Sequence, residues 1–463
     1  MNSIQQDARD SRKAWGRTAV IVGAGVAGLS AAAAIRGHFD RTIVLERDRL
    51  PETLLRRPSV PQAAHVHVLL AGGLVALEQL MPGVGEDLSR AGAVRLCIDR
   101  DLRVERAPFD PLPARDCGFY SYALSRPLLE QCLRDRVRAL TDVEIRDDTR
   151  VFALLSSAAG DVRGVRYACE TGDQRELEAD LVVDCSGRSE LFGALIRTAN
   201  LPEPPRTRIG IELMYSSATF EQPRGFSADW KAVVTLAQAP VSSAGGLLAP
   251  IEGDRWIVSL SGRHAHQPGG DSASFADFAR TLRTPTIAQA IDGAALLDQP
   301  ARFAHRESVR LHIEAMSSFP VHLVVLGDAS CRFNPIYGQG MSIAAQQACA
   351  LGQWLQARSS GVDPWQALAG EFRAQLASIV DAAWGASAIP DLQYPETVGA
   401  RPNDLPQRAM RSQILLHMAA QDAEINRMVQ RVQHLLDSPA VLFTPEFRQR
   451  MAALIKLGKI PIY

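Results

Sequence analysis

The first fifty residues contain two short apolar runs joined by small residues. Residues 18–22 read TAVIV and are followed at once by GAGVAGL and an alanine-rich stretch. A continuous apolar run of this length predicts a buried strand, and the small residues predict a helix that packs closely on it. A second apolar run, residues 41–45, ends at Glu46. This part of the chain therefore predicts a strand, a helix and a second strand.

Helical and strand-like patterns alternate through the next 140 residues. An irregular loop rich in proline and arginine comes first. The pattern then predicts a helix over residues 72–90, broken at Pro82 and Gly83, and another from Arg126, which Ser125 can cap. Strands are predicted within 94–104 and at 120–124, 143–145 together with 150–155, 162–168 and 177–184, the last three as a meander.

The period changes to strand-like alternation between residues 206 and 302. Four runs there, with a turn at Gly253 and Asp254, predict an antiparallel sheet closed by one helix over 274–282. A buried strand ending at Gly327 and Asp328 follows. The last part predicts a helix over 341–356 and further helices, interrupted at 390–406. We therefore predict an α/β protein with a discontinuous nucleotide-binding domain (17–205 and 303–358), a substrate domain (206–302, with room for part of 72–120) and a C-terminal helical region (359–463).

Composition excludes several classes of partner. The 463 residues carry a formal net charge of -1, which provides no basic surface for nucleic acid. The 7 cysteines are odd in number and form no CxxC pair, so we predict no zinc site, no disulfide framework and a cytoplasmic location. No apolar stretch is long enough to span a membrane. Residues 1–17 are polar and resemble no secretory signal, which predicts a loose tail.

The glycine spacing after the first strand indicates a dinucleotide site. The first glycine permits a tight turn, the second permits close approach of a pyrophosphate, and the third permits helix–strand packing. Glu46 follows at the distance where a ribose hydroxyl needs an acceptor. The alternative is a glycine-rich turn in an ordinary α/β domain. The residues expected to meet the pyrophosphate are Gly23, Gly25, Val26, Ala27 and Gly28.

Two other segments bear on the cofactor. His65 and His67 form an HxH pair, which suggests a metal, but no third ligand is nearby, so we predict no metal and a structural or cofactor-side role. The distant pair Gly327 and Asp328 and the segment 338–340 (GQG) are expected to close on the same cofactor. A nicotinamide dehydrogenase needs one nucleotide fold only, so this convergence favours FAD.

The motifs GAGVAGL, LER, LGDA and NPIYGQGM occur in the order found in flavoprotein monooxygenases of the aromatic-hydroxylase fold, and the chain resembles them over most of its length. More narrowly, VPQAAHVHVLLAGG, LLAPIEGDRWIVSLSG, LVVDCSGR and GDASCRFNPIYGQGMS are similar to bacterial polyketide epoxidases of the polyether type. The resemblance implies a Rossmann-like FAD-binding domain, an inserted antiparallel-sheet substrate domain and C-terminal helices.

The resemblance also implies roles for individual residues. Gly23, Gly25 and Gly28 would hold the pyrophosphate, and Glu46 the adenosine ribose. The other implied cofactor contacts are Arg47 beside the adenine, Gln62, Arg126 at the phosphate or ribityl chain, Asp328 on the ribityl and phosphate side, and Pro335, Gly338, Gly340 and Met341 along the isoalloxazine. No catalytic side chain is predicted, because the cofactor carries the chemistry.

The implied reaction transfers one oxygen atom from a flavin C4a-hydroperoxide to an electron-rich alkene or aromatic intermediate of secondary metabolism, by epoxidation or hydroxylation. The implied partners are dioxygen, an apolar small molecule, and NADPH or NADH used directly or through a flavin reductase. Many aromatic hydroxylases carry an Asp-Gly motif where this chain has Asp184-Cys185-Ser186-Gly187, which speaks against direct nicotinamide use. Two alternatives remain, a flavin-dependent halogenase, although no WxWxIP sequence occurs, and a non-redox cyclase that binds FAD structurally.

Overall fold

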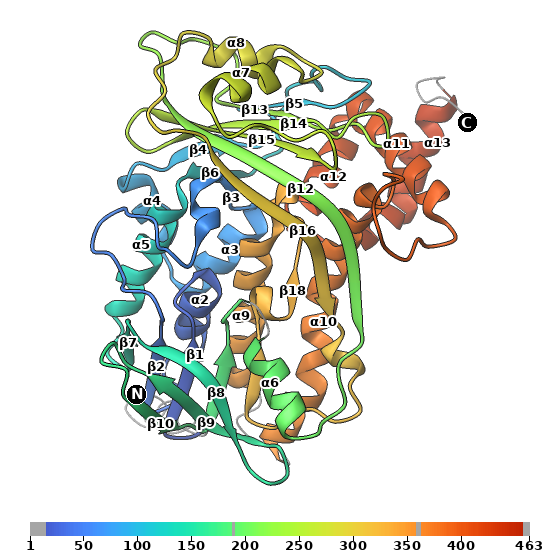
Figure 1. Ribbon diagram of the computed structural model, residues 1–463. Coiled ribbons are helices and arrows are strands. Elements are labelled where there is room, and N and C mark those ends of the chain that lie inside the picture. The colour runs from blue at the N-terminus through green and yellow to red at the C-terminus, as the bar shows by residue number, and fades with distance from the viewer. Residues whose placement is uncertain (1–14, 188–189, 358–362, 457–463) are drawn as a thin grey trace, which may run out of the picture.

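A computed structural model describes residues 15–187, 190–357 and 363–456. Figure 1 shows a parallel sheet at one end of the molecule and a larger sheet at the other, joined by the long strands β12 and β16. Helices α9 and α10 run alongside these two strands (Figure 1). The mixed α/β fold with C-terminal helices predicted from the sequence is confirmed.

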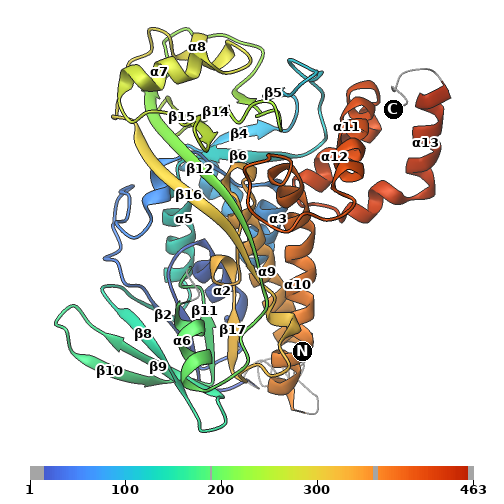
Figure 2. The ribbon, with the colours of Figure 1, turned by 45° about the vertical axis from the view of Figure 1, so that its right-hand side comes forward.

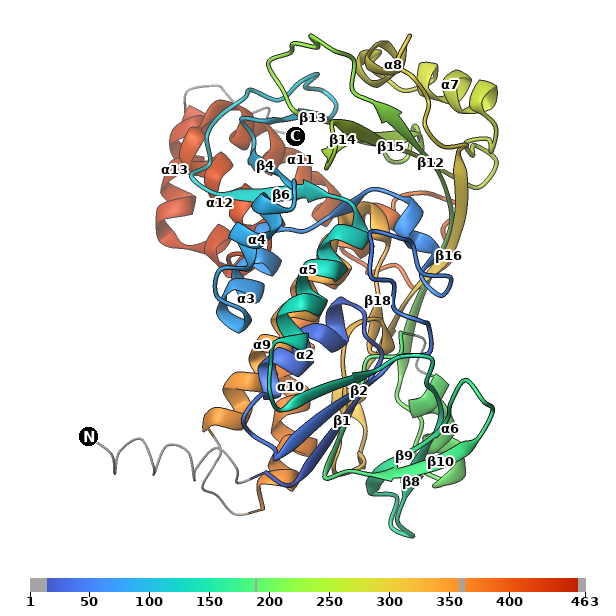
Figure 3. The ribbon, with the colours of Figure 1, turned by 90° about the vertical axis from the view of Figure 1, so that its left-hand side faces the viewer.

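The parallel sheet contains the strand–helix–strand unit expected from the first apolar runs. Its side chains alternate between two apolar clusters, with Ile21 on the face covered by helices and Val20 on the other. Figure 3 shows α2 and α5 above the helical face. The strand order is β17 (Leu323–Val325), β11 (Leu181–Asp184), β1 (Thr18–Val22), β2 (Arg41–Leu45), β7 (Val143–Arg146), and the helices on that face are α2 (Val26–Ile35), α5 (Arg126–Arg138) and α9 (Gln339–Ala357).

The predicted strand 177–184 is two strands in different sheets, so the expectation of one strand was wrong. The carboxylate of Asp180 separates them, accepting hydrogen bonds from the amides of Arg17 (2.7 Å) and Thr18 (2.8 Å). The pieces 143–145 and 150–155, which were predicted together, likewise form two strands in different sheets. The three-stranded antiparallel sheet is β8 (Arg150–Ser156), β9 (Val162–Ala168) and β10 (Gln174–Glu178), with α6 (Glu190–Thr198) beside β8.

The loose tail predicted for residues 1–17 is wrong for its last three residues. Trp15 is buried, and its indole N–H donates to the carbonyl of Leu355 at 2.9 Å. A large aromatic ring is a strong anchor because it buries much apolar area. Residues 1–14 lie outside the described residues.

The larger sheet includes more of the chain than the predicted segment 206–302. It is antiparallel except where β5 joins β13 in parallel, and the turn predicted at Gly253 and Asp254 is confirmed. Two helices, α7 (Ser272–Arg280) and α8 (Thr286–Ile291), pack against it instead of the one predicted. The division into domains stays a prediction. The strand order is β18 (Cys331–Arg332), β16 (Ala301–Leu311), β12 (Arg206–Glu221), β15 (Arg255–Arg263), β14 (Gly245–Ile251), β13 (Ala232–Thr235), β5 (Leu102–Glu105).

The remaining elements connect and flank these sheets. A third sheet joins β3 (His67–Val68), β6 (Tyr120–Leu124) and β4 (Val94–Cys97), and α3 (Ala71–Leu80) and α4 (Val84–Arg90) are separated as predicted. Helix α10 (Pro364–Asp391) continues through Pro390 and ends at Asp391. The interruption that was predicted to begin at residue 390 therefore begins at residue 392. Figure 2 shows α11 (Leu405–Gln421), α12 (Ala423–Gln433) and α13 (Pro445–Lys456) to one side of the sheets. Within the described residues, no helix has the length and apolar character needed to cross a membrane.

Replacing Gly28 with alanine tests the close packing of α2 on β1. A Cβ at Gly28 would lie 1.8 Å from the carbonyl oxygen of Gly23, so the backbone must move. We expect Gly28→Ala to destabilise the protein by about 2 kcal/mol or more, as overpacking does. Thermal unfolding measures this.

Gly370 provides the matched control, because it is exposed on α10 and its added Cβ would meet nothing within 4 Å. Gly370→Ala should leave stability unchanged or raise it by about 0.5–1 kcal/mol. Equal melting temperatures for Gly28→Ala and the parent protein would contradict this account of the turn.

Candidate functional site

The turn between β1 and α2 begins at a glycine whose backbone conformation other residues rarely adopt. Gly23 has φ 101°, a left-handed conformation, and its amide donates to the carbonyl of Leu45 at 2.8 Å. Helix α2 begins at Val26 without any side-chain cap from Gly25. Its first amide groups are therefore available to an anion, as at other phosphate-binding helix termini.

Glu46 ties this turn to the end of β2. Its carboxylate accepts from the amides of Ala24 (2.7 Å) and Asp48 (3.0 Å), and it is ion-paired with Arg57 at 3.0 Å. The side chain is 6% exposed. Glu46 thus fixes the shape of the turn, a role that its spacing did not predict, while its contact with a ribose stays a prediction.

Arg57 begins a buried series of opposite charges. Its guanidinium donates twice to Glu130, at 3.0 and 2.8 Å, and Glu130 accepts from Arg126 Nε at 2.7 Å. We call Glu46, Arg57, Glu130 and Arg126 the charge chain. Burial alone would raise the pKa of Glu130, but the charges of Arg126 and Arg57 outweigh it, and the pKa is lowered.

The charge chain ends beside the β1–α2 turn. A Cβ at Gly25 would lie 3.8 Å from Arg126 Nη2, 3.9 Å from Arg57 Nη2 and 4.0 Å from Glu130 Oε1. Two guanidinium groups therefore approach the turn at the residue whose missing side chain leaves room. Guanidinium groups and free helix amides both recognise phosphate oxygens, so these residues fit a pyrophosphate.

Sequence reasoning predicted Arg126 and missed Arg57. The only signal available was the arginine content of the irregular loop. Glu130 is 73 residues away in sequence, and no motif spacing relates it to Arg57.

A distant segment meets the same turn. Gly327 has φ 62°, its amide donates to Gln347 Oε1 at 2.8 Å, and its Cβ would lie 3.0 Å from the Cβ of Ala27. The following residue, Asp328, is therefore next to the first turn of α2. Its side chain is exposed at the surface of the site, yet it lies deep enough that burial raises its pKa, against the opposing charges of Arg126 and Arg332.

The last group of predicted site residues lies in residues 334–341, which we call the glycine loop. Gly338 has φ 65°, and its Cβ would lie 3.1 Å from the Cβ of Val68. A Cβ at Gly340 would lie 3.7 Å from Asp328 Oδ1. Pro335 is exposed at the start of a 3-10 helix, and Met341 is partly buried against the core near α2.

Asp391, the last residue of α10, accepts hydrogen bonds from two residues of the glycine loop and from the larger sheet. Its carboxylate accepts from Arg263 (2.6 Å), from Asn334 Nδ2 (2.9 and 3.0 Å) and from the Tyr337 hydroxyl (2.9 Å). Burial raises the pKa of Tyr337 well above its ordinary value. The sequence did not predict this network, because its members come from β15, the glycine loop and the C-terminal helices.

The HxH pair does not converge on one point. His65 Nδ1 bonds to Ser217 Oγ at 2.7 Å, whereas His67 Nδ1 bonds to the His65 carbonyl at 2.9 Å. Burial lowers the pKa of His65 to about 4 and that of His67 to about 3, so both are neutral at physiological pH. The described residues contain no group of three His, Cys, Asp or Glu side chains placed to hold a metal.

Two predicted residues lie at the edge of the site. Arg47 is exposed and donates to the carbonyl of Ser59 at 3.5 Å. Gln62 is exposed on a short 3-10 helix, Pro61–Ala64. Neither has a described contact with the β1–α2 turn, so their cofactor contacts stay predictions.

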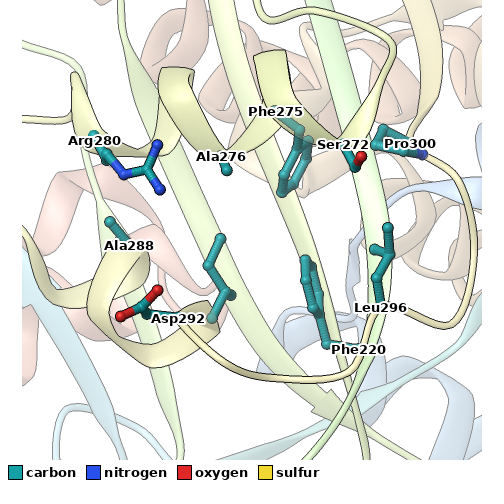
Figure 4. Close-up of a pocket in the computed structure, with 10 residues that line it drawn as sticks. Phe220, Ser272, Phe275, Ala276, Arg280, Ala288, Asp292, Leu296 and Pro300 are labelled. Carbon is teal, nitrogen blue, oxygen red and sulfur yellow. The ribbon is translucent and has the colours of Figure 1, made fainter.

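Two surface pockets lie elsewhere. One pocket, of about 130 Å³, lies between the larger sheet and the helices α7 and α8 (Figure 4). Phe220, Phe275 and Ile291 are among the residues that line it. Ligand pockets usually measure roughly 300 Å³ or more, so it is too small for a dinucleotide. The other, beside Arg41 and Asp180, lies at the amino end of the parallel sheet, whereas open α/β sheets bind ligands at the carboxyl end.

Comparison with known proteins agrees with this geometry. A model of the family described as FAD binding domain matches residues 17–368, more than half of the chain. The chain belongs to this family. The matched FAD binding domain contains the β1–α2 turn, the charge chain and the glycine loop, and Asp391 lies beyond it.

Individual relatives cover most of the chain. Protein Rv3254 of Mycobacterium tuberculosis is 31% identical over 394 residues, covering 81% of this chain and 80% of that protein. Squalene epoxidase 4 of Arabidopsis thaliana is 27% identical over 352 residues, covering 74% of this chain and 62% of the plant protein. The solved structure of flavin-dependent brominase Bmp2 is similar with a TM-score of 0.66, over 96% of this chain and 100% of the brominase, at 14% identity. At that identity the brominase shows the fold alone.

Removing the central carboxylate of the charge chain should destabilise the protein. Glu130→Gln leaves the buried Arg57 and the partly buried Arg126 without their shared counter-charge, and breaking such a buried pair typically costs about 3–5 kcal/mol. Because folding lowers the pKa of Glu130, its contribution is complete above the unfolded-state pKa and is lost as pH falls through the lowered value. The stability difference between parent and variant should therefore be full at neutral pH and shrink in acid.

Urea unfolding across this pH range measures the difference, with Glu178→Gln, an exposed site on β10, as the control. A difference that stayed constant down to the acid limit would show that Glu130 does not act through its charge.

Asp328 should matter more for FAD retention than Asp254. Asp328 adjoins the β1–α2 turn, whereas Asp254 lies in an exposed hairpin turn. Losing a hydrogen bond from a charged group costs about 1.5–3 kcal/mol, so Asp328→Ala should weaken FAD binding roughly tenfold or more. Titrating both apoproteins with FAD measures this, and equal affinities would remove Asp328 from the site.

Proposed function

We propose that the protein is an FAD-dependent monooxygenase that inserts one oxygen atom of dioxygen into an electron-rich, largely apolar small molecule by epoxidation or hydroxylation. The observation that carries the proposal is the meeting of the β1–α2 turn, Asp328 and the glycine loop. Squalene epoxidases among the relatives support an alkene substrate. The motif resemblance to polyketide epoxidases supports a substrate from secondary metabolism.

The chain's own residues would bind and orient the cofactor. The amides at the start of α2, with Arg57 and Arg126, would hold the pyrophosphate, and Asp328 would accept from the ribityl hydroxyls. The glycine loop would lie against the isoalloxazine, where the N-terminus of α9 favours negative charge. When bound and reduced, FAD supplies the activation of dioxygen.

The larger sheet has an inner face, opposite the one covered by α7 and α8, that is suited to an apolar substrate. Val233 and Leu248 face α7 and α8, so their neighbours Val234 and Leu247 lie on the opposite face, where they are partly exposed. On the same face Tyr215 and Phe303 are direct cross-strand partners and pack in one cluster with Ile336 of the glycine loop. These apolar side chains would exclude water beside the cofactor. This register was not available from the sequence.

The segment 184–187 bears on the source of electrons. Asp184 is fully buried, and its carboxylate accepts from the Ser186 amide at 2.9 Å. It is therefore not presented to a nicotinamide. We propose that a flavin reductase supplies the electrons, with NADPH or NADH as their origin, and that direct reduction is slow.

Isotope labelling tests the proposal. The FAD-loaded protein, a flavin reductase, NADH and ¹⁸O₂ are combined with a panel of polyenes and aromatic polyketides. We expect one labelled oxygen atom in an epoxide or hydroxyl product, measured by mass spectrometry, and no product from the apoprotein. Equal product under argon would instead indicate the non-redox cyclase, and a halide-dependent product would indicate the halogenase.

A further inference from the structure

Neighbouring residues at the end of β5 have opposite surroundings. Glu105 is fully buried and accepts from the hydroxyls of Thr235 (2.7 Å) and Thr286 (2.5 Å) and from Arg103 Nε (2.9 Å). Thr286 begins α8, so Glu105 faces the helices that cover the outer face of the larger sheet. Because side chains alternate along a strand, Arg106 lies on the inner face.

The backbone agrees with this placement. Thr235 is the partner of Glu105 in the parallel pairing of β13 and β5, and the amide of Leu236 donates to the Glu105 carbonyl at 2.9 Å. Leu236 is therefore beside Arg106, on the same face as Val234. Both apolar side chains are partly exposed.

Arg106 is an arginine without a counter-charge. In the described part of the chain, its guanidinium makes no hydrogen bond or ion pair with a carboxylate, whereas Arg103 pairs with Glu105 and Arg263 with Asp391. Burial lowers the pKa of Arg106, and the group that opposes this effect is Tyr337 of the glycine loop. Arg106 is partly buried, and a cation partly removed from water without a counter-charge is unfavourable, a cost that an anionic ligand would relieve.

The turn that carries Arg106 is held in place. Arg106 and Phe109 exchange backbone hydrogen bonds of 2.9 and 2.8 Å. The ring of Phe109 packs on His417 of α11, with centroids 5.3 Å apart, and Asp110 is ion-paired with Arg283. The guanidinium is thus presented from a fixed backbone, which reduces the entropy lost when a ligand binds.

We propose that Arg106 binds a carboxylate of the substrate, so that the enzyme acts on an apolar acid whose chain lies along Val234, Leu236 and Leu247 beside the glycine loop. A guanidinium matches a carboxylate with two parallel hydrogen bonds, which fixes both position and orientation. This inference rests on the proposed function, because it assigns the substrate class of the same site.

Ligand binding to the FAD-loaded protein tests the inference. The probes are decanoate and methyl decanoate, which share an apolar chain and differ in charge, and the readout is the change in flavin absorbance during titration. We expect decanoate to bind the parent protein at least about tenfold more tightly than it binds Arg106→Gln, the loss typical of one charged hydrogen bond. Methyl decanoate should bind both proteins alike.

Arg302→Gln is the matched control. Arg302 is exposed and precedes Phe303 on β16, so it lies on the outer face of the sheet. The affinity of the Arg302→Gln variant for decanoate should equal that of the parent protein.

Three results would overturn the inference. They are equal decanoate affinity in the parent protein and Arg106→Gln, failure of decanoate to bind the FAD-loaded parent protein, and loss of FAD from Arg106→Gln, which would assign Arg106 to the cofactor. The first two leave FAD in place and do not touch the proposed function. A parent protein that takes up no FAD would instead end the proposed function.

Discussion

The site depends on the buried alternation of charge from Glu46 through Arg57 and Glu130 to Arg126. Each carboxylate lies between donors, so no charge in the series is left alone away from water. The series also positions the backbone of the β1–α2 turn, because Glu46 accepts a hydrogen bond from the Ala24 amide. Arg126 and Arg57 approach the same turn at Gly25. One set of interactions therefore shapes the turn and places positive charge beside it.

A second constraint connects the candidate site to the rest of the molecule. Asp391 lies on the C-terminal helix α10 but binds Asn334 and Tyr337 of the glycine loop and Arg263 of the larger sheet. Removing any one donor from so buried a carboxylate would leave it under-compensated. Helix α10 therefore supports the glycine loop, although the family match ends at residue 368.

Local patterns predicted the elements well, and long-range pairing set the limit of prediction. The run 18–22, the cap at Ser125 and the turn at Gly253 each depend on neighbouring residues, and the structure has them all. The run 177–184 looked continuous because nothing local reveals that Asp180 binds the amides of residues 17 and 18.

The candidate site shows the same limit. Glycine spacing identified the turn, because steric limits at each glycine are local. Arg57, Glu130 and Asp391 were not predicted because a buried ion pair leaves no periodic signal in the sequence. The Arg57–Glu130 and Asn334–Asp391 pairs join residues that are 73 and 57 positions apart. Arg106 is similar, since its lack of a counter-charge among the described residues becomes visible only in the folded structure.

The central claim is that this turn and its charges bind a dinucleotide flavin through the pyrophosphate. Titrating the apoprotein with FAD and with FMN, by quenching of flavin fluorescence, tests it most directly, because FMN keeps the isoalloxazine and lacks the adenylate half. The account predicts that FAD binds more tightly by at least about 1.4 kcal/mol, which is tenfold in affinity. Equal affinity for FAD and FMN would contradict it.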